Sequence, residues 1–128
     1  MSGKSNYLET QLLNHVLRNT AYSSPTTIYV ALFTTAPTEA GGGVEVTGGS
    51  YARQSVTFTV PAPDSCSNSA DITFPMATAD WGTVEAFALF DQSSGGNMLY
   101  FANLTASREI LTNDQFRFPS GQLLVTED

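Results

Sequence analysis

The stretch TTIYVALFTTAPTEAGGGVEVTGGSYARQ, residues 26–54, decides the fold class, because it joins the clearest strand of the chain to its most glycine-rich loop. Apolar side chains occupy both faces of residues 28–33. Ile28, Val30 and Leu32 alternate with Tyr29, Ala31 and Phe33. Side chains of a β-strand point to opposite faces with a period of two, so this pattern predicts a strand that is covered on both sides. We expect this strand to lie in the middle of a sheet.

The second half of the stretch, residues 35–50, is predicted to be a long Gly-rich loop. Its run Gly41, Gly42 and Gly43 carries a large backbone entropy cost, and little apolar surface is available to offset it. A phosphate cradle is disfavoured, since the loop lacks a P-loop pattern and contains Glu39 and Glu45. We predict instead a mobile loop whose three glycines contact a neighbouring subunit.

One amphipathic helix is predicted over residues 5–19. Asn6 followed by Glu9 resembles a capping box, and Pro25 favours extended chain before the first strand. His15 is interpreted as a solvated or capping side chain. The apolar residues that recur at helical spacing are Leu8, Leu12, Leu13, Val16 and Leu17.

The rest of the chain is predicted to be β-structure. Residues 51–60 alternate, with Val56, Phe58 and Val60 expected to face the core. Residues 84–90 and 97–104 flank the turn sequence DQSSGG and are expected to pair antiparallel. Shorter strands are expected within residues 70–74, 116–118 and 123–126.

About seven strands, one preceding helix and no alternation of strands with helices predict a mainly β fold, an antiparallel β-sandwich of jelly-roll or Ig-like type. We predict a single domain over residues 1–128, with the sandwich spanning residues 26–126. At 128 residues the chain is long enough to bury one substantial core.

Composition narrows the classes of function. A net charge of −7 disfavours a nucleic-acid partner through repulsion. No apolar run approaches a membrane span and no secretory signal is visible, so we expect a soluble protein made in the cytoplasm. Charged residues make up only 13% of the chain, which suits extensive polar protein contacts.

Groups for catalysis or metal binding are few. The chain has one His and one Cys, Cys66, and nothing like GxSxG occurs. A zinc site has too few soft ligands. We therefore predict no enzyme, no cofactor and no metal. The only tryptophan, Trp81, is expected to close one end of the core, with an aromatic platform for a sugar as the alternative.

Several segments resemble a family of small tailed-bacteriophage virion proteins often labelled phage tail fibre protein. They are the helix YLETQLLNHVLR, the strand YVALFT leading to APTEAGGG, the segment SYARQ, and the turns DITFP and DWGTV. The resemblance covers nearly the whole chain. It implies a non-enzymatic structural protein of the virion, made in the bacterial host.

Two positions on the phage particle, and one other class of protein, are the alternatives. A tail-associated fibre or adaptor subunit would assemble into symmetric oligomers and could touch host glycans. A capsid decoration protein would bind the major capsid protein. A carbohydrate-binding module would use Trp81, Tyr51 and Tyr100. For assembly we expect contacts from Leu12, Val16 and the three loop glycines, and from Arg53 in SYARQ, whose partner the sequence does not identify.

Overall fold

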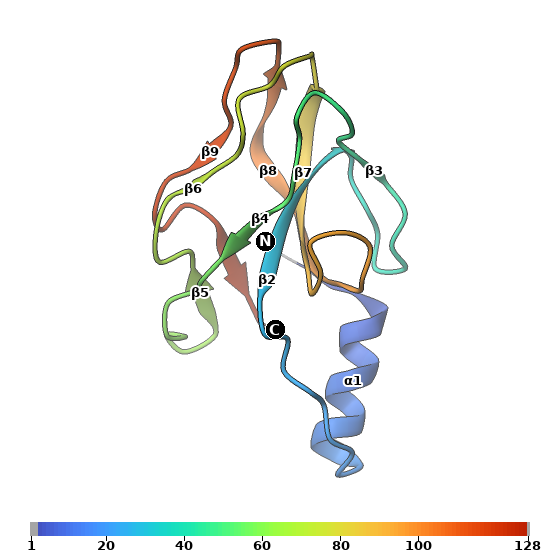
Figure 1. Cartoon of the computed structure of the whole chain (residues 1–128). Coiled ribbons are helices and arrows are strands. Elements are labelled where there is room, and N and C mark those ends of the chain that lie inside the picture. Colours follow the sequence, from blue (N-terminus) through green and yellow to red (C-terminus); the bar gives the residue numbers. More distant parts are fainter. Residues whose placement is uncertain (1–2, 128) are drawn as a thin grey trace.

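The computed structural model describes residues 3–127 and shows an antiparallel β-structure with one helix near the N-terminus (Figure 1). In chain order the elements are β1 (Gly3–Lys4), α1 (Asn6–Leu17), β2 (Ile28–Thr35), β3 (Val44–Glu45), β4 (Gln54–Val56), β5 (Ser65–Ser67), β6 (Ile72–Thr73), β7 (Gly82–Phe90), β8 (Met98–Ile110), β9 (Arg117–Phe118) and β10 (Leu124–Thr126).

The main sheet has the order β1-β8-β7-β2-β3, and β4 also pairs with β2. Every pairing in it is antiparallel. β2 is an interior strand of this sheet, as predicted, with β7 on one side and β3 and β4 on the other. It pairs with β7 from Tyr29↔Phe90 to Phe33↔Ala86. The hairpin expected around DQSSGG is also confirmed, because β7 and β8 are neighbours.

A second layer packs against one face of this sheet. It contains two two-stranded ladders, β5 with β10 and β6 with β9, which lie beside the main sheet in Figure 1. The main core fills the space between the layers, and the mainly β, sandwich-like fold is therefore confirmed. The buried residues that the main sheet contributes to this core include Val30, Leu32, Val84, Phe87 and Leu89. Those from the second layer include Ile72, Phe74, Phe116, Phe118 and Val125.

The other face of β2 and β7 is covered as well. Ala31, Phe33, Ala86, Ala88 and Met98 form a smaller buried cluster there. The predicted double cover of the first strand is thus confirmed, because the two alternating sets of β2 lie in two separate clusters.

The expected strand over residues 51–60 is much shorter than predicted. Of these residues only β4 pairs with β2. Beyond β4 the Thr59 N–H donates to Ser67 O, so the chain has crossed to the second layer. Val56 faces the core, but Val60 is 86% exposed, and its predicted burial is wrong. Pro61 follows directly and starts the connecting loop.

The expected strand over residues 97–104 is longer than predicted. β8 continues to Ile110, and Thr83↔Glu109 continues the pairing with β7. Its second half, TASREI, is mostly polar and exposed, so no apolar alternation indicated a strand there. The short strands β1, β3 and β5 were also not predicted, since their sequences GK, VE and SCS contain no alternating apolar side chains.

Candidate assembly site

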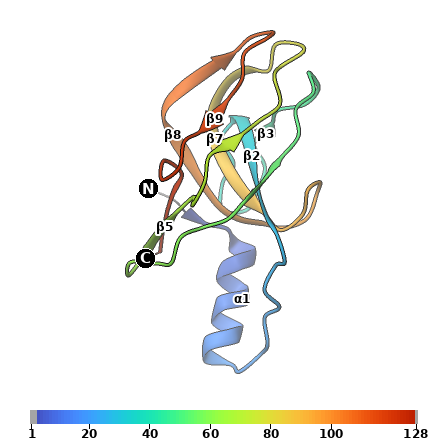
Figure 2. The same ribbon diagram turned by 60° about the vertical axis from the view of Figure 1, so that its left-hand side comes forward.

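Helix α1 extends away from the β-layers, and the chain that follows it runs back beside it to β2 in both views (Figures 1 and 2). Twelve residues span about 18 Å. Leu8, in the first turn, is the helix's buried residue, at 5% exposure. An isolated helix of this length is marginal in water, and residues 15–17 at its C-terminal end are all exposed.

The start of α1 is held by Ser5 and not by the predicted cap Asn6. The Ser5 hydroxyl accepts a hydrogen bond from Leu8 N at 3.1 Å and also donates to Met98 O. Its own N–H donates to Leu99 O at 2.9 Å. Ser5 therefore caps the helix and also joins it to β8 by hydrogen bonds, which explains why this side chain is buried.

The free end of the helix carries an apolar stripe. Leu13 is 59% exposed, Val16 71% and Leu17 74%. At helical spacing these three side chains fall within an arc of about 100°. Leu12 is partly buried beside them. We call Leu13, Val16 and Leu17 the helix stripe.

The Gly-rich loop is a short hairpin with an open tip. Thr38 and Gly41 form an isolated bridge, and the return strand β3 pairs with β2. Gly41 and Gly42 have open space where a Cβ would lie. Gly43 is different, because a Cβ there would meet Thr35 O at 2.6 Å. Two of the predicted contact glycines are therefore presented outwards, and the third is needed for backbone packing.

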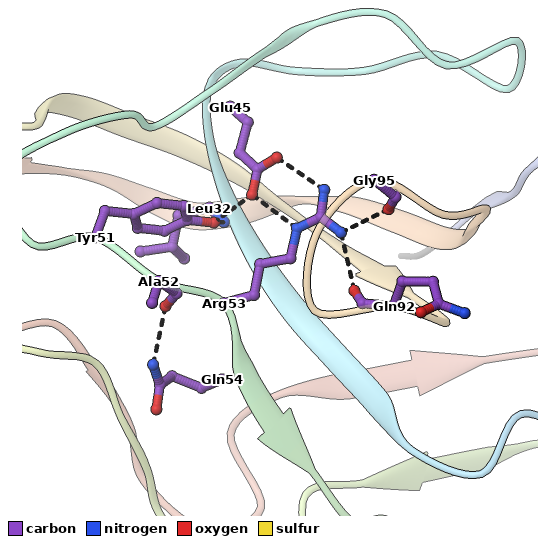
Figure 3. A network of polar contacts seen from close by, with 8 residues as sticks. All are labelled: Leu32, Glu45, Tyr51, Ala52, Arg53, Gln54, Gln92 and Gly95. Atoms are coloured by element: carbon purple, nitrogen blue, oxygen red, sulfur yellow. Dashed lines mark hydrogen bonds and ion pairs between the residues drawn. The ribbon is translucent and has the colours of Figure 1, made fainter.

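Arg53 joins three segments of the chain (Figure 3). Its Nε and Nη2 donate to the two carboxylate oxygens of Glu45, each at 2.9 Å. Its Nη1 donates to Gln92 O at 3.0 Å and to Gly95 O at 2.8 Å. The guanidinium lies 3.8 Å from the centroid of the Phe90 ring, at cation–π distance. We call these residues the arginine clamp.

Tyr51 belongs to the same network (Figure 3). Its hydroxyl donates to Glu45 Oε2 at 2.7 Å and accepts from Leu32 N at 3.0 Å. Burial opposes ionisation of Glu45, but the hydrogen bonds from Arg53 and Tyr51 and the charge of Arg53 outweigh it, so the Glu45 pKa is lowered. Burial and the hydrogen bond to Glu45 raise the Tyr51 pKa. The clamp is thus an ionised pair with a neutral phenol at neutral pH.

The clamp supplies the partner of Arg53 that the sequence did not identify. The Arg53 side chain is only 7% exposed, and its donors are directed to groups of the same chain. Its position therefore supports an internal role, holding the loop between β7 and β8 against β3. Glu45 and Arg53 are eight residues apart across a turn, and no periodic pattern marks such a pair.

The three aromatic candidates for sugar contact are engaged inside the domain. Trp81 is 5% exposed and its indole N–H donates to Gly49 O at 2.9 Å. Tyr51 packs edge-on against Trp81, with the ring centroids 5.4 Å apart. The Tyr100 hydroxyl donates to Glu127 at 2.6 Å. The Trp81 ring is therefore part of the main core and offers no open face on which a sugar could stack.

Neither a metal centre nor a membrane span is found in the part of the chain that the structure describes. Residues 3–127 contain no group of three or more His, Cys, Asp or Glu side chains placed to hold a metal ion. The helix they contain is too short to cross a bilayer.

The structure defines a mainly β, sandwich-like body from which one helix projects. A family model described as "Podophage GP4 fiber I protein gp80" matches residues 3–126. The chain therefore belongs to this family of phage fibre proteins, and the predicted resemblance is confirmed. Membership supports a tail-associated structural role. No curated protein matches the chain.

Proposed function

We propose that this protein is a non-enzymatic, tail-associated fibre or adaptor subunit that forms symmetric oligomers on the particle through the helix stripe. The observation that carries the proposal is the exposure of Leu13, Val16 and Leu17 on a helix whose fully buried residue, Leu8, lies in the first turn. A second copy of the chain is the proposed occupant.

The stripe suits association between like copies. Its three residues repeat at i, i+3 and i+4, so two or more copies of α1 can bury the same stripe against one another about a symmetry axis. Burying a Leu or Val side chain contributes roughly 1.5–3 kcal/mol. Three such side chains on every copy are a substantial contribution to an oligomer.

Other virion proteins are the proposed partners of the assembled subunit, and the virion is its proposed location. Gly41 and Gly42 at the tip of the Gly-rich hairpin are proposed as a second contact point, because this tip is open. In this proposal Arg53 acts indirectly, by fixing the loop next to that hairpin.

A paired substitution in the phage tests the proposal. Val16→Asp together with Leu17→Asp is expected to preserve the β-body, because both side chains are exposed, and to reduce the amount of subunit in purified particles. Val60→Asp is the matched control, because Val60 is also an exposed valine but lies far along the chain in the loop after β4. Normal incorporation of the helix variant would show that α1 is not an assembly element.

Copy number tests the placement. A count of a small multiple of three or six subunits per particle supports the tail. A count in the hundreds would instead place the protein on the capsid, as a decoration protein.

A further inference from the structure

We propose that the groove between β8 and the segment from Phe116 to Gln122 binds an acidic saccharide through Arg108 and Arg117. This inference deepens the proposed fibre role, on which it rests, by giving the chemical class of a host-surface ligand. The groove has a volume of about 690 Å³. Volumes in this range are usual for sites that enclose small ligands.

An irregularity in β8 forms one wall of the groove. Val84 pairs with Arg108, but Ala86 pairs with Asn103, so residues 104–107 of β8 lie opposite Glu85 alone. Such bulges bend a strand and redirect its side chains, and they are common beside functional sites. Here the bulge places Asn103, Thr105 and Arg108 along one groove.

The other wall comes from the segment around the last turn. Arg117 and Gln122 line it, and the side chain of Arg117 is 56% exposed. Between the walls lie phenylalanine rings that are also part of the main core. The rings that line the groove are those of Phe87, Phe116 and Phe118.

The charge of this groove differs from that of the whole molecule. The chain has a net charge of −7 and only five Lys or Arg residues, yet two of these line one groove. Among residues 3–127, Arg108 forms no ion pair, and its guanidinium lies 5.3 Å from the centroid of the Phe116 ring. Arg117 has only a 3.6 Å pair with Asp71, and both side chains are more than half exposed. Such a pair contributes little.

These groups match a sugar that carries a carboxylate. Guanidinium groups bind carboxylates with two parallel hydrogen bonds, and stacking on an aromatic ring orients the guanidinium beforehand. The amides of Asn103 and Gln122 and the hydroxyl of Thr105 can both donate to and accept from sugar hydroxyls.

Titration of the purified full-length protein tests the inference. The probes are trigalacturonate and sialyllactose, with maltotriose and lactose as neutral counterparts, and amide chemical shifts are recorded. Both acidic probes are expected to shift amides of residues 103–108 and 116–122, with a dissociation constant on the order of 1 mM that weakens with salt. The neutral sugars are expected to bind at least about tenfold more weakly.

Two charge-matched variants locate the site. Arg108→Ala is expected to weaken binding by about tenfold or more, since one charge-assisted contact is lost. Arg18→Ala removes the same charge at the end of α1 and is expected to leave affinity within about twofold. Arg108→Gln, with its amide spectrum compared with that of the unaltered protein, separates loss of binding from loss of folding.

Failure of this inference is distinguishable from failure of the fibre role. Absence of shifts with both acidic probes, or equal effects of Arg108→Ala and Arg18→Ala, overturns the saccharide site even if the subunit assembles normally. If neither probe binds and Arg108→Ala lowers incorporation into particles, the groove is a contact between virion proteins and the inference is wrong.

Discussion

β2 and α1 carry similar amounts of apolar sequence, yet the folded chain treats them in opposite ways. Val30, Leu32 and Phe33 in β2 are at most 4% exposed, because sheet layers and loops cover both faces. Val16 and Leu17 in α1 are more than 70% exposed. The comparison indicates that apolar periodicity shows where a surface can be buried, but not whether the burying partner belongs to the same chain.

The largest expected effect separates these two regions directly. Leu32→Ala removes a fully buried side chain and is expected to lower the free energy of unfolding by about 3–4 kcal/mol. Leu17→Ala is expected to change it by less than about 0.5 kcal/mol in a dilute sample. Urea unfolding of both variants checks this. Equal destabilisation would mean that the helix stripe belongs to the monomer's core.

The arginine clamp is expected to be the next most sensitive feature. Arg53→Ala leaves the partly buried carboxylate of Glu45 without its ion pair and is expected to cost about 3 kcal/mol. The matched control is Arg117→Ala, whose ion pair with Asp71 is exposed, and whose cost is expected below about 0.5 kcal/mol. Thermal unfolding compares the two. A small effect at Arg53 would contradict its internal role.

The Gly-rich hairpin allows a comparison between two neighbours. Gly42 and Gly43 have φ of 77° and 72°, so alanine suffers similar backbone strain at both. Only at Gly43 does a new Cβ also meet backbone atoms, including Thr35 O at 2.6 Å. Gly43→Ala is therefore expected to be less stable than Gly42→Ala by about 1–2 kcal/mol in chemical denaturation. Equal values would show that this hairpin adjusts freely.

The smallest expected effect is the response of the clamp to acid. The pKa of Glu45 in the folded protein lies below its ordinary value of 4.5, so its stabilising contribution is complete above that value. It is lost as the pH falls through the lower, folded-state pKa. The free energy of unfolding of Glu45→Gln is therefore expected to vary less with pH across this window. If the free energy of unfolding varied with pH in the same way for Glu45→Gln and for the unaltered protein, the lowered pKa of Glu45 would be contradicted.

Parts of this structure were predictable because they depend on local pattern. The two-sided alternation of β2, the hairpin of β7 and β8, and the inward positions of Phe116 and Phe118 all follow from a period of two. The family was predictable from combined segments such as SYARQ and DITFP.

Other parts depend on contacts between distant segments. The arginine clamp needs Arg53 to meet carbonyls some forty positions away, and Ser5 caps α1 because β8 lies beside it. The bulge at residues 104–107 follows from how β8 pairs with β7. Local sequence does not specify such pairings, since they are decided by packing of the whole chain.

The central claim is that the helix stripe joins copies of the chain, while the β-body folds without it. Sedimentation equilibrium of the unaltered protein and of Val16→Asp with Leu17→Asp, over a broad range of protein concentration, tests this claim most directly. The account predicts a symmetric oligomer for the first and a folded monomer for the second. A monomer for the unaltered protein, or the same oligomer for both, would contradict it.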